Sequence, residues 1–131
     1  MNKIIRVLGI DVGSKKTGLA IGESLTKTAA PLRLLRKEAA QIKAQDLLPI
    51  VREWQISCIA IGLPLPADGK ITPLIREIYR LGDELREQNL EVYFVDETLS
   101  SHSARAEFGK RKEYDSAAAA IIAETCLAEN F

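Results

Sequence analysis

The run CIAIGL, residues 58–63, contains no polar side chain and is followed at once by the loop-like sequence PLPADGK. It has the length of a strand, and a strand without a polar face must be buried on both sides. Such a strand lies within a sheet that carries helices on both faces, which predicts an α/β layered domain. No linker, repeat or low-complexity tract interrupts the chain, so we expect a single domain over residues 1–131.

Strand-like and helix-like segments alternate around this run. We predict strands at residues 4–11, 19–22, 30–35, 58–63 and 91–95, and helices at residues 39–54, 72–85, 100–108 and 115–127. Pro49 predicts a late start or a kink in the first helix. Thr72 and Pro73 predict the start of the second, because they match a capping residue followed by proline at the first helical position.

Composition argues against several classes of protein. The chain is 47% hydrophobic and 27% charged, the balance of a globular fold with one core. No apolar stretch is long enough to cross a membrane and the start lacks a signal-peptide pattern, so we expect a cytoplasmic protein. Cys58 and Cys126 lie in apolar runs and are predicted to be free buried thiols. His102 is the only histidine, which argues against a zinc site or a triad with a histidine base.

Acidic residues close two of the predicted strands. Asp11 follows RVLGI, and Asp96 and Glu97 follow EVYFV. Active sites of open α/β sheets lie at the carboxyl ends of strands. Asp115 belongs with them if it points inward, since it shares a helical stripe with Ala118, Ala119, Ile122 and Cys126. A cluster of carboxylates repels itself unless cations fill it, and its oxygens suit Mg²⁺ or Mn²⁺.

Each of these acids also has a simpler interpretation. Asp115 is well placed to cap the last helix, Glu97 could be an ordinary loop acid, and turn amides after Asp11 could hold that carboxylate. Taken singly, capping is the better interpretation of Asp115. Convergence of three acids at one edge of the sheet favours the metal site.

Basic residues gather near the acids, although the formal net charge is +0. Lys15 and Lys16 follow Asp11, and GKRK at residues 109–112 precedes Asp115. Further cations follow the first pair, namely Lys27, Arg33, Arg36 and Lys37. A single basic run is usually a solvated turn, but two runs that each flank an acid favour binding of a polyanion.

Four motifs in this order resemble the YqgF family, also called RuvX. They are GIDVGSKKTGLAIG, IAIGLPLPADGK, VDETLSS and DSAAAAIIAE, and together they cover nearly the whole chain. Members of this bacterial family are regarded as Holliday junction resolvases and as nucleases that process the 5′ end of pre-16S rRNA. The resemblance implies a ribonuclease H-like fold, with a five-stranded mixed sheet whose first three strands are antiparallel and which is flanked by helices.

The resemblance also implies a site and an activity. The presumed catalytic and metal-binding acids are Asp11, Glu97 and Asp115, with Mg²⁺ or Mn²⁺ as cofactor. The basic side chains would hold backbone phosphates, and they are Lys15, Lys16, Lys110, Arg111 and Lys112. The expected enzyme is a metal-dependent endonuclease, a hydrolase acting as monomer or homodimer in ribosome biogenesis, with a Holliday junction resolvase in DNA recombination as the alternative.

Two other classes of function stay open. GIDVGS also resembles the phosphate-binding turn of sugar and acetate kinases, but those enzymes close two such lobes around ATP and this chain contains one. A non-catalytic nucleic-acid-binding module on the same fold is the second. Thr98 stands where the family commonly has arginine, and the segment EFGKRKEY before Asp115 is short, two departures that keep this module open.

Overall fold

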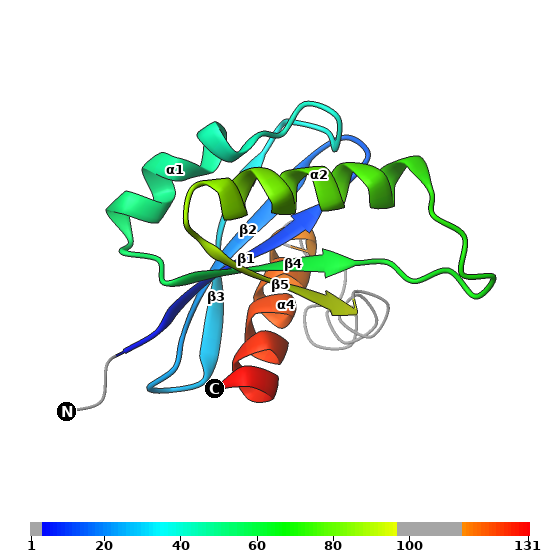
Figure 1. The fold of residues 1–131 in the computed structure, drawn as a ribbon. Helices are drawn as coiled ribbons and strands as arrows, with labels where there is room; N and C mark the ends of the chain where they lie inside the picture. Colours follow the sequence, from blue (N-terminus) through cyan, green and yellow to red (C-terminus); the bar gives the residue numbers. More distant parts are fainter. Residues whose placement is uncertain (1–3, 97–113) are drawn as a thin grey trace.

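The computed structural model, which describes residues 4–96 and 114–131, contains one mixed sheet of five strands with helices on both faces (Figure 1). In the last segment, side chains are described from residue 117. The strands are β1 (Arg6–Val12), β2 (Thr17–Glu23), β3 (Thr28–Leu35), β4 (Cys58–Leu63) and β5 (Glu91–Asp96). The helices are α1 (Ala44–Glu53), α2 (Pro73–Glu87) and α4 (Tyr114–Asn130). The predicted helix at residues 100–108 lies outside the described residues.

The sheet has the strand order β3-β2-β1-β4-β5. The pairs β1–β2 and β2–β3 are antiparallel, whereas β1–β4 and β4–β5 are parallel. This arrangement confirms the mixed sheet with three antiparallel strands first. It also explains the apolar run of β4, because that strand is paired on both edges and every one of its residues is buried.

Alternate residues of the central strands face two separate halves of the core. Leu8 and Ile10 of β1 pack with residues of α1 and α2 on one face of the sheet. Val7 of β1 and Ala60 of β4 pack with Ile122 and other residues of α4 on the opposite face. Side chains in a strand alternate between faces, so Asp11 belongs to the face covered by α4.

Helix α4 is buried far more completely than one helical stripe requires. Residues 117–123 are all buried, and the predicted stripe through Ala118, Ala119, Ile122 and Cys126 is confirmed as part of this surface. Both cysteines are free and buried, as predicted. Within the part of the chain that the structure describes, no helix is both long enough and apolar enough to cross a membrane.

Helix α1 begins five residues later than predicted, at Ala44 instead of residue 39. The preceding residues form turns held by α2, because the guanidinium of Arg80 donates to the carbonyls of Ala39 (3.0 Å) and Ile42 (2.8 Å). The helix then starts where the backbone N–H of Lys43 donates to Asp46 at 2.9 Å. Residues 39–42 therefore do not form a helix despite their hydrophobic spacing, because their carbonyls bind a residue about forty positions away.

Candidate active site

The carboxyl ends of β1, β4 and β5 meet at one edge of the sheet, which we call the carboxyl edge. Ile10 of β1 lies beside Ile61 of β4, and Leu63 of β4 lies beside Asp96 of β5. Asp11 is partly buried at this edge and Asp96 is exposed. Asp96 shares its strand face with Phe94, which packs on the α1 and α2 side, so Asp11 and Asp96 belong to opposite faces of the sheet.

Gly9 allows α4 to lie directly on β1. A Cβ atom at Gly9 would stand 2.3 Å from the carbonyl oxygen of Ala119 and 2.9 Å from the Cβ of Ala123. Both distances are shorter than any normal contact, so only glycine permits this approach. The crossing point of α4 over β1 is thereby set two residues before Asp11.

The far end of α4 shows the direction in which the helix runs. Farther along the helix, Leu127 lies over Gly22, and Gly22 pairs with Val7 near the start of β1. The amino end of α4 therefore points toward the carboxyl edge, as Figure 1 shows.

The two elements also advance in step. From Ala119 back to Asp115 the helix axis covers about 6 Å. From Gly9 to Asp11 the strand covers about 6.6 Å. The first turn of α4 and the end of β1 therefore extend a similar distance beyond this crossing point, on the same face of the sheet.

The turn between β1 and β2 forms a small cavity beside Asp11. Its volume is about 230 Å³, and it is lined by Asp11, Gly13, Ser14, Lys15 and Lys16. A Cβ at Gly13 would lie 2.4 Å from the carbonyl oxygen of Lys16, so the turn is as tight as backbone contact allows. Both lysines are exposed, and the cavity thus combines a carboxylate with two cations at its rim.

The same turn is braced by the segment that follows β3. Thr17, whose side chain is fully buried, donates its hydroxyl to the carbonyl oxygen of Lys37 at 2.9 Å, and the N–H of Ala39 donates to the carbonyl oxygen of Gly13 at 3.0 Å. Arg80 holds the other side of Ala39. The position of Asp11 therefore depends on a chain of contacts that runs back to α2.

An ion pair fixes this bracing segment to α1. Lys37 Nζ lies 2.8 Å from Asp46 Oδ1. Partial burial of Asp46 acts to raise the pKa of its carboxyl group, but hydrogen bonds from Lys37 and from the backbone of Lys43 outweigh it, and the pKa is lowered. Lys37 is therefore partly neutralised by Asp46.

The structure brings together Asp11, Lys15 and Lys16 among the residues predicted from the sequence, and Asp115 belongs to the first turn of α4. The other predicted site residues lie outside the described residues, and they are Glu97, Lys110, Arg111 and Lys112. Sequence reasoning missed Gly9, Thr17 and Arg80 as the residues that set the geometry. Only Gly9 carries a local signal, because a glycine within an apolar strand indicates close approach of another backbone.

One described carboxylate, that of Asp11, lies in the cavity at this edge. Within residues 4–96 and 117–131, no three side chains of the histidine, cysteine, aspartate and glutamate types converge closely enough to hold a metal. Carboxylate oxygens with no histidine or thiolate among them match the ligands that Mg²⁺ and Mn²⁺ prefer.

A protein-family model described as RuvX, Holliday junction resolvase, matches residues 5–129. The chain belongs to the RuvX family. Its relatives include a protein of Maridesulfovibrio salexigens that is 35% identical over 95% of this chain and 98% of its own length. Another, from Paraburkholderia xenovorans, is 32% identical over 92% of this chain and 86% of its own length. Both relatives carry the name "Putative pre-16S rRNA nuclease".

Solved structures show the same fold at much lower identity. Thermus thermophilus RuvC in complex with a Holliday junction substrate has a TM-score of 0.60 at 14% identity, covering 95% of this chain and 94% of that one. The fowlpox virus Holliday junction resolvase has a TM-score of 0.62 at 10% identity, covering 97% and 100%. This RuvX family member therefore has the ribonuclease H-like fold that the sequence motifs implied.

Proposed function

We propose that this RuvX family member is a metal-dependent endonuclease that hydrolyses phosphodiester bonds in structured nucleic acid, and that its substrate is the 5′ end of pre-16S rRNA. The observation that supports the proposal is the close approach of α4 to β1 at Gly9, two residues before Asp11, with the amino end of the helix toward the carboxyl edge. Family membership and the names of the relatives support the choice of substrate. We further propose that residues 1–131 act as one domain, as a monomer or homodimer in the cytoplasm.

The reaction adds water across a P–O3′ bond and leaves a 5′-phosphate and a 3′-hydroxyl. When bound, divalent cations supply the Lewis acidity that makes water nucleophilic and stabilises the leaving oxygen. Asp11 and Asp115 would hold Mg²⁺ or Mn²⁺, with Glu97 as the third carboxylate. These three residues are the catalytic acids of the proposal.

The protein's own basic side chains would position the substrate. Lys15 and Lys16 stand at the rim of the cavity that Asp11 lines, where they attract a phosphate toward the carboxylates. Lys110, Arg111 and Lys112, which precede Asp115 in the sequence, would add contacts to the backbone of the nucleic acid. Contacts of this kind carry no base specificity, so affinity should fall steeply with added salt.

The second candidate substrate is a four-way DNA junction. The description of the family model as a Holliday junction resolvase favours it. A junction has two symmetric strands to cut, so this reaction requires a homodimer, whereas trimming of one rRNA end does not.

The test compares wild type with Asp11→Asn on a pre-16S rRNA leader and on a four-way junction, in Mg²⁺, Mn²⁺ or EDTA. We expect the wild type to cut with metal only, and Asp11→Asn to lose cleavage while its fold and most of its nucleic-acid affinity persist. Asp83→Asn, the same change at an exposed position of α2, is the matched control and should cleave like wild type. Undiminished cleavage by Asp11→Asn would refute the site, and binding without cleavage by wild type would make the protein a binding module.

A further inference from the structure

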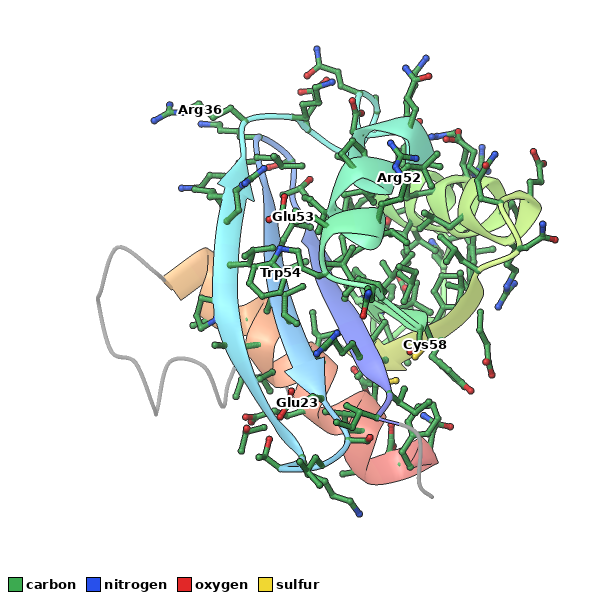
Figure 2. The ribbon with its side chains drawn as sticks, turned by 90° about the vertical axis from the view of Figure 1, so that its left-hand side faces the viewer. Glu23, Arg36, Arg52, Glu53, Trp54 and Cys58 are labelled. Atoms are coloured by element: carbon green, nitrogen blue, oxygen red, sulfur yellow. The ribbon has the colours of Figure 1, made fainter. Side chains whose placement is uncertain are left out.

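The antiparallel pairing of β1, β2 and β3 brings a second set of cations to the carboxyl edge. Val12 at the end of β1 pairs with Thr17, and Thr17 pairs with Leu35 at the end of β3. The residues that directly follow Leu35 therefore lie beside the turn that contains Lys15 and Lys16. Figure 2 shows Arg36 at this end of β3, pointing away from the sheet.

The cations at this end of β3 are exposed to solvent. Arg33 and Arg36 are exposed, as are Lys15 and Lys16 of the neighbouring turn. Lys37 is paired with Asp46 and is left aside. We name the set Lys15, Lys16 and Arg36 the basic edge.

The opposite end of the same hairpin provides a contrast. Lys27 lies in the turn between β2 and β3, next to Glu23, which pairs with Arg6 at the start of β1. It is therefore a full strand length away from Asp11. Of these two cations that follow Lys16 in the sequence, Arg36 is near the candidate site and Lys27 is not.

The spacing of the basic edge matches a nucleic-acid backbone that passes Asp11. Arg36 lies two strand spacings from β1, a lateral separation of about 10 Å. With a rise of about 3.4 Å per nucleotide, this equals roughly three nucleotides. A phosphate at the carboxylates and a phosphate at Arg36 can thus belong to one strand.

The outer edge of β3 is open to a bulky ligand, but it does not favour pairing with another β-strand. Among the strands that the structure describes, it is the last of the sheet and pairs with β2 alone. Pro31 lies within it, and the pairing with β2 is irregular between Leu19 and Ala20. Proline and such bulges oppose the addition of another strand, which leaves charge as the feature this edge offers.

We propose that the basic edge binds the sugar-phosphate backbone of the substrate on one side of the cut, with Arg36 contacting a phosphate about three nucleotides from the scissile bond. The proposal rests on the proposed function, because the position of the cut along the nucleic-acid strand is counted from Asp11 as a catalytic residue. The recognised chemistry is the phosphodiester backbone, which carries no sequence information. The flanking strand therefore leaves the site across β3.

The test measures how the affinity for a labelled four-way junction and a labelled rRNA leader depends on salt, in EDTA so that no strand is cut. Arg36→Gln should lower the slope of log K against log salt by about 0.9 for duplex, or about 0.7 for a single strand, the change for one lost phosphate contact. Arg52→Gln is the matched control, because Arg52 lies in the last turn of α1, just before residues that contact Arg6 at the start of β1. It should leave the slope and cleavage unchanged.

A second measurement locates the contact along the strand. Substrates shortened on one side of the cut should bind wild type more weakly once the flank is under about three nucleotides. Arg36→Gln should not respond to shortening on that same side. Equal slopes and equal length dependence for Arg36→Gln and Arg52→Gln would overturn the basic edge.

The two proposals fail in different ways. If wild type cleaves with metal but Arg36→Gln behaves like Arg52→Gln, the nuclease assignment stands and the basic edge is wrong. If wild type binds without cleaving but Arg36→Gln loses slope, the basic edge stands as a binding surface and the nuclease assignment is wrong. In cleavage assays, the effect of Arg36→Gln is expected mainly in KM and not in kcat.

Discussion

Replacing Gly9 with alanine would place one carbon atom between α4 and β1. That Cβ would stand 2.3 Å from the carbonyl oxygen of Ala119, whereas carbon–oxygen contacts of about 3.3 Å or more are normal. The oxygen belongs to the helix backbone, so no side chain can move to relieve the contact. The helix must therefore shift away from the strand by about 1 Å.

Two consequences follow from that shift, and they can be measured separately. Overpacking of this kind costs about 1–3 kcal/mol in the free energy of unfolding, which urea denaturation followed by circular dichroism would detect. A displacement of about 1 Å between catalytic groups can lower the rate by about 10²-fold. Because Asp115 is on α4 and Asp11 is on β1, we expect a loss of that size in kcat/KM for the folded variant.

Gly22→Ala is the matched control, since Gly22 lies under the same helix at its far end. A Cβ there would meet side-chain atoms, Leu127 Cδ1 at 3.0 Å and Ala29 Cβ at 3.1 Å, and the end of a leucine side chain can turn aside. Gly22→Ala should therefore cost less stability and leave cleavage close to that of wild type. If Gly9→Ala matches wild type in both stability and cleavage, the register of α4 on β1 is not what aligns the acids.

Three further predictions concern the parts that support the site. Thr17→Val should cost about 1–3 kcal/mol in urea denaturation, since it leaves the Lys37 carbonyl without its donor, and Thr17→Ser should restore most of the loss. Partial burial acts to raise the pKa of Glu84, but the Ala44 N–H and Arg80 lower it below its usual 4.5. The pKa of Glu84 is thus lower in the folded than in the unfolded protein. The free energy of unfolding of wild type should therefore exceed that of Glu84→Gln by its full amount above pH 4.5, and the difference should vanish as the pH falls through the folded pKa. A hydrogen bond with Cys126 and burial both raise the pKa of the Cys58 thiol. A thiol reagent should therefore label Cys58 only as the protein unfolds with increasing urea, and labelling of Cys58 in the native state would contradict this.

Local patterns in the sequence were enough where neighbouring residues decide the structure. The all-apolar run at residues 58–63 is β4 with the same bounds, and Thr72 caps α2 through a 3.2 Å hydrogen bond from the N–H of Ile75. Asp11 lies at the carboxyl edge, as its position after an apolar run predicted. In each case the hydrophobic period or the cap is complete within a few residues.

The sequence alone could not show how distant segments are brought together. Helix α1 starts late because Arg80, far along the chain, binds the carbonyls before it, and no local pattern reveals such a partner. Arg36 and Lys27 look alike in the sequence, yet strand pairing places one beside the site and the other a strand length away.

The sequence thus determined the chemistry of the candidate site, whereas the tertiary structure determined its geometry. The sequence by itself determined which side chains are available, namely carboxylates at element ends with cations close by, and it determined the order of strands and helices. Only the tertiary structure decided where α4 crosses β1, through the contact of Ala119 and Ala123 with Gly9. The physical reason is that propensity and hydrophobic period act over a few residues, whereas register between a helix and a strand depends on contacts between atoms more than a hundred residues apart.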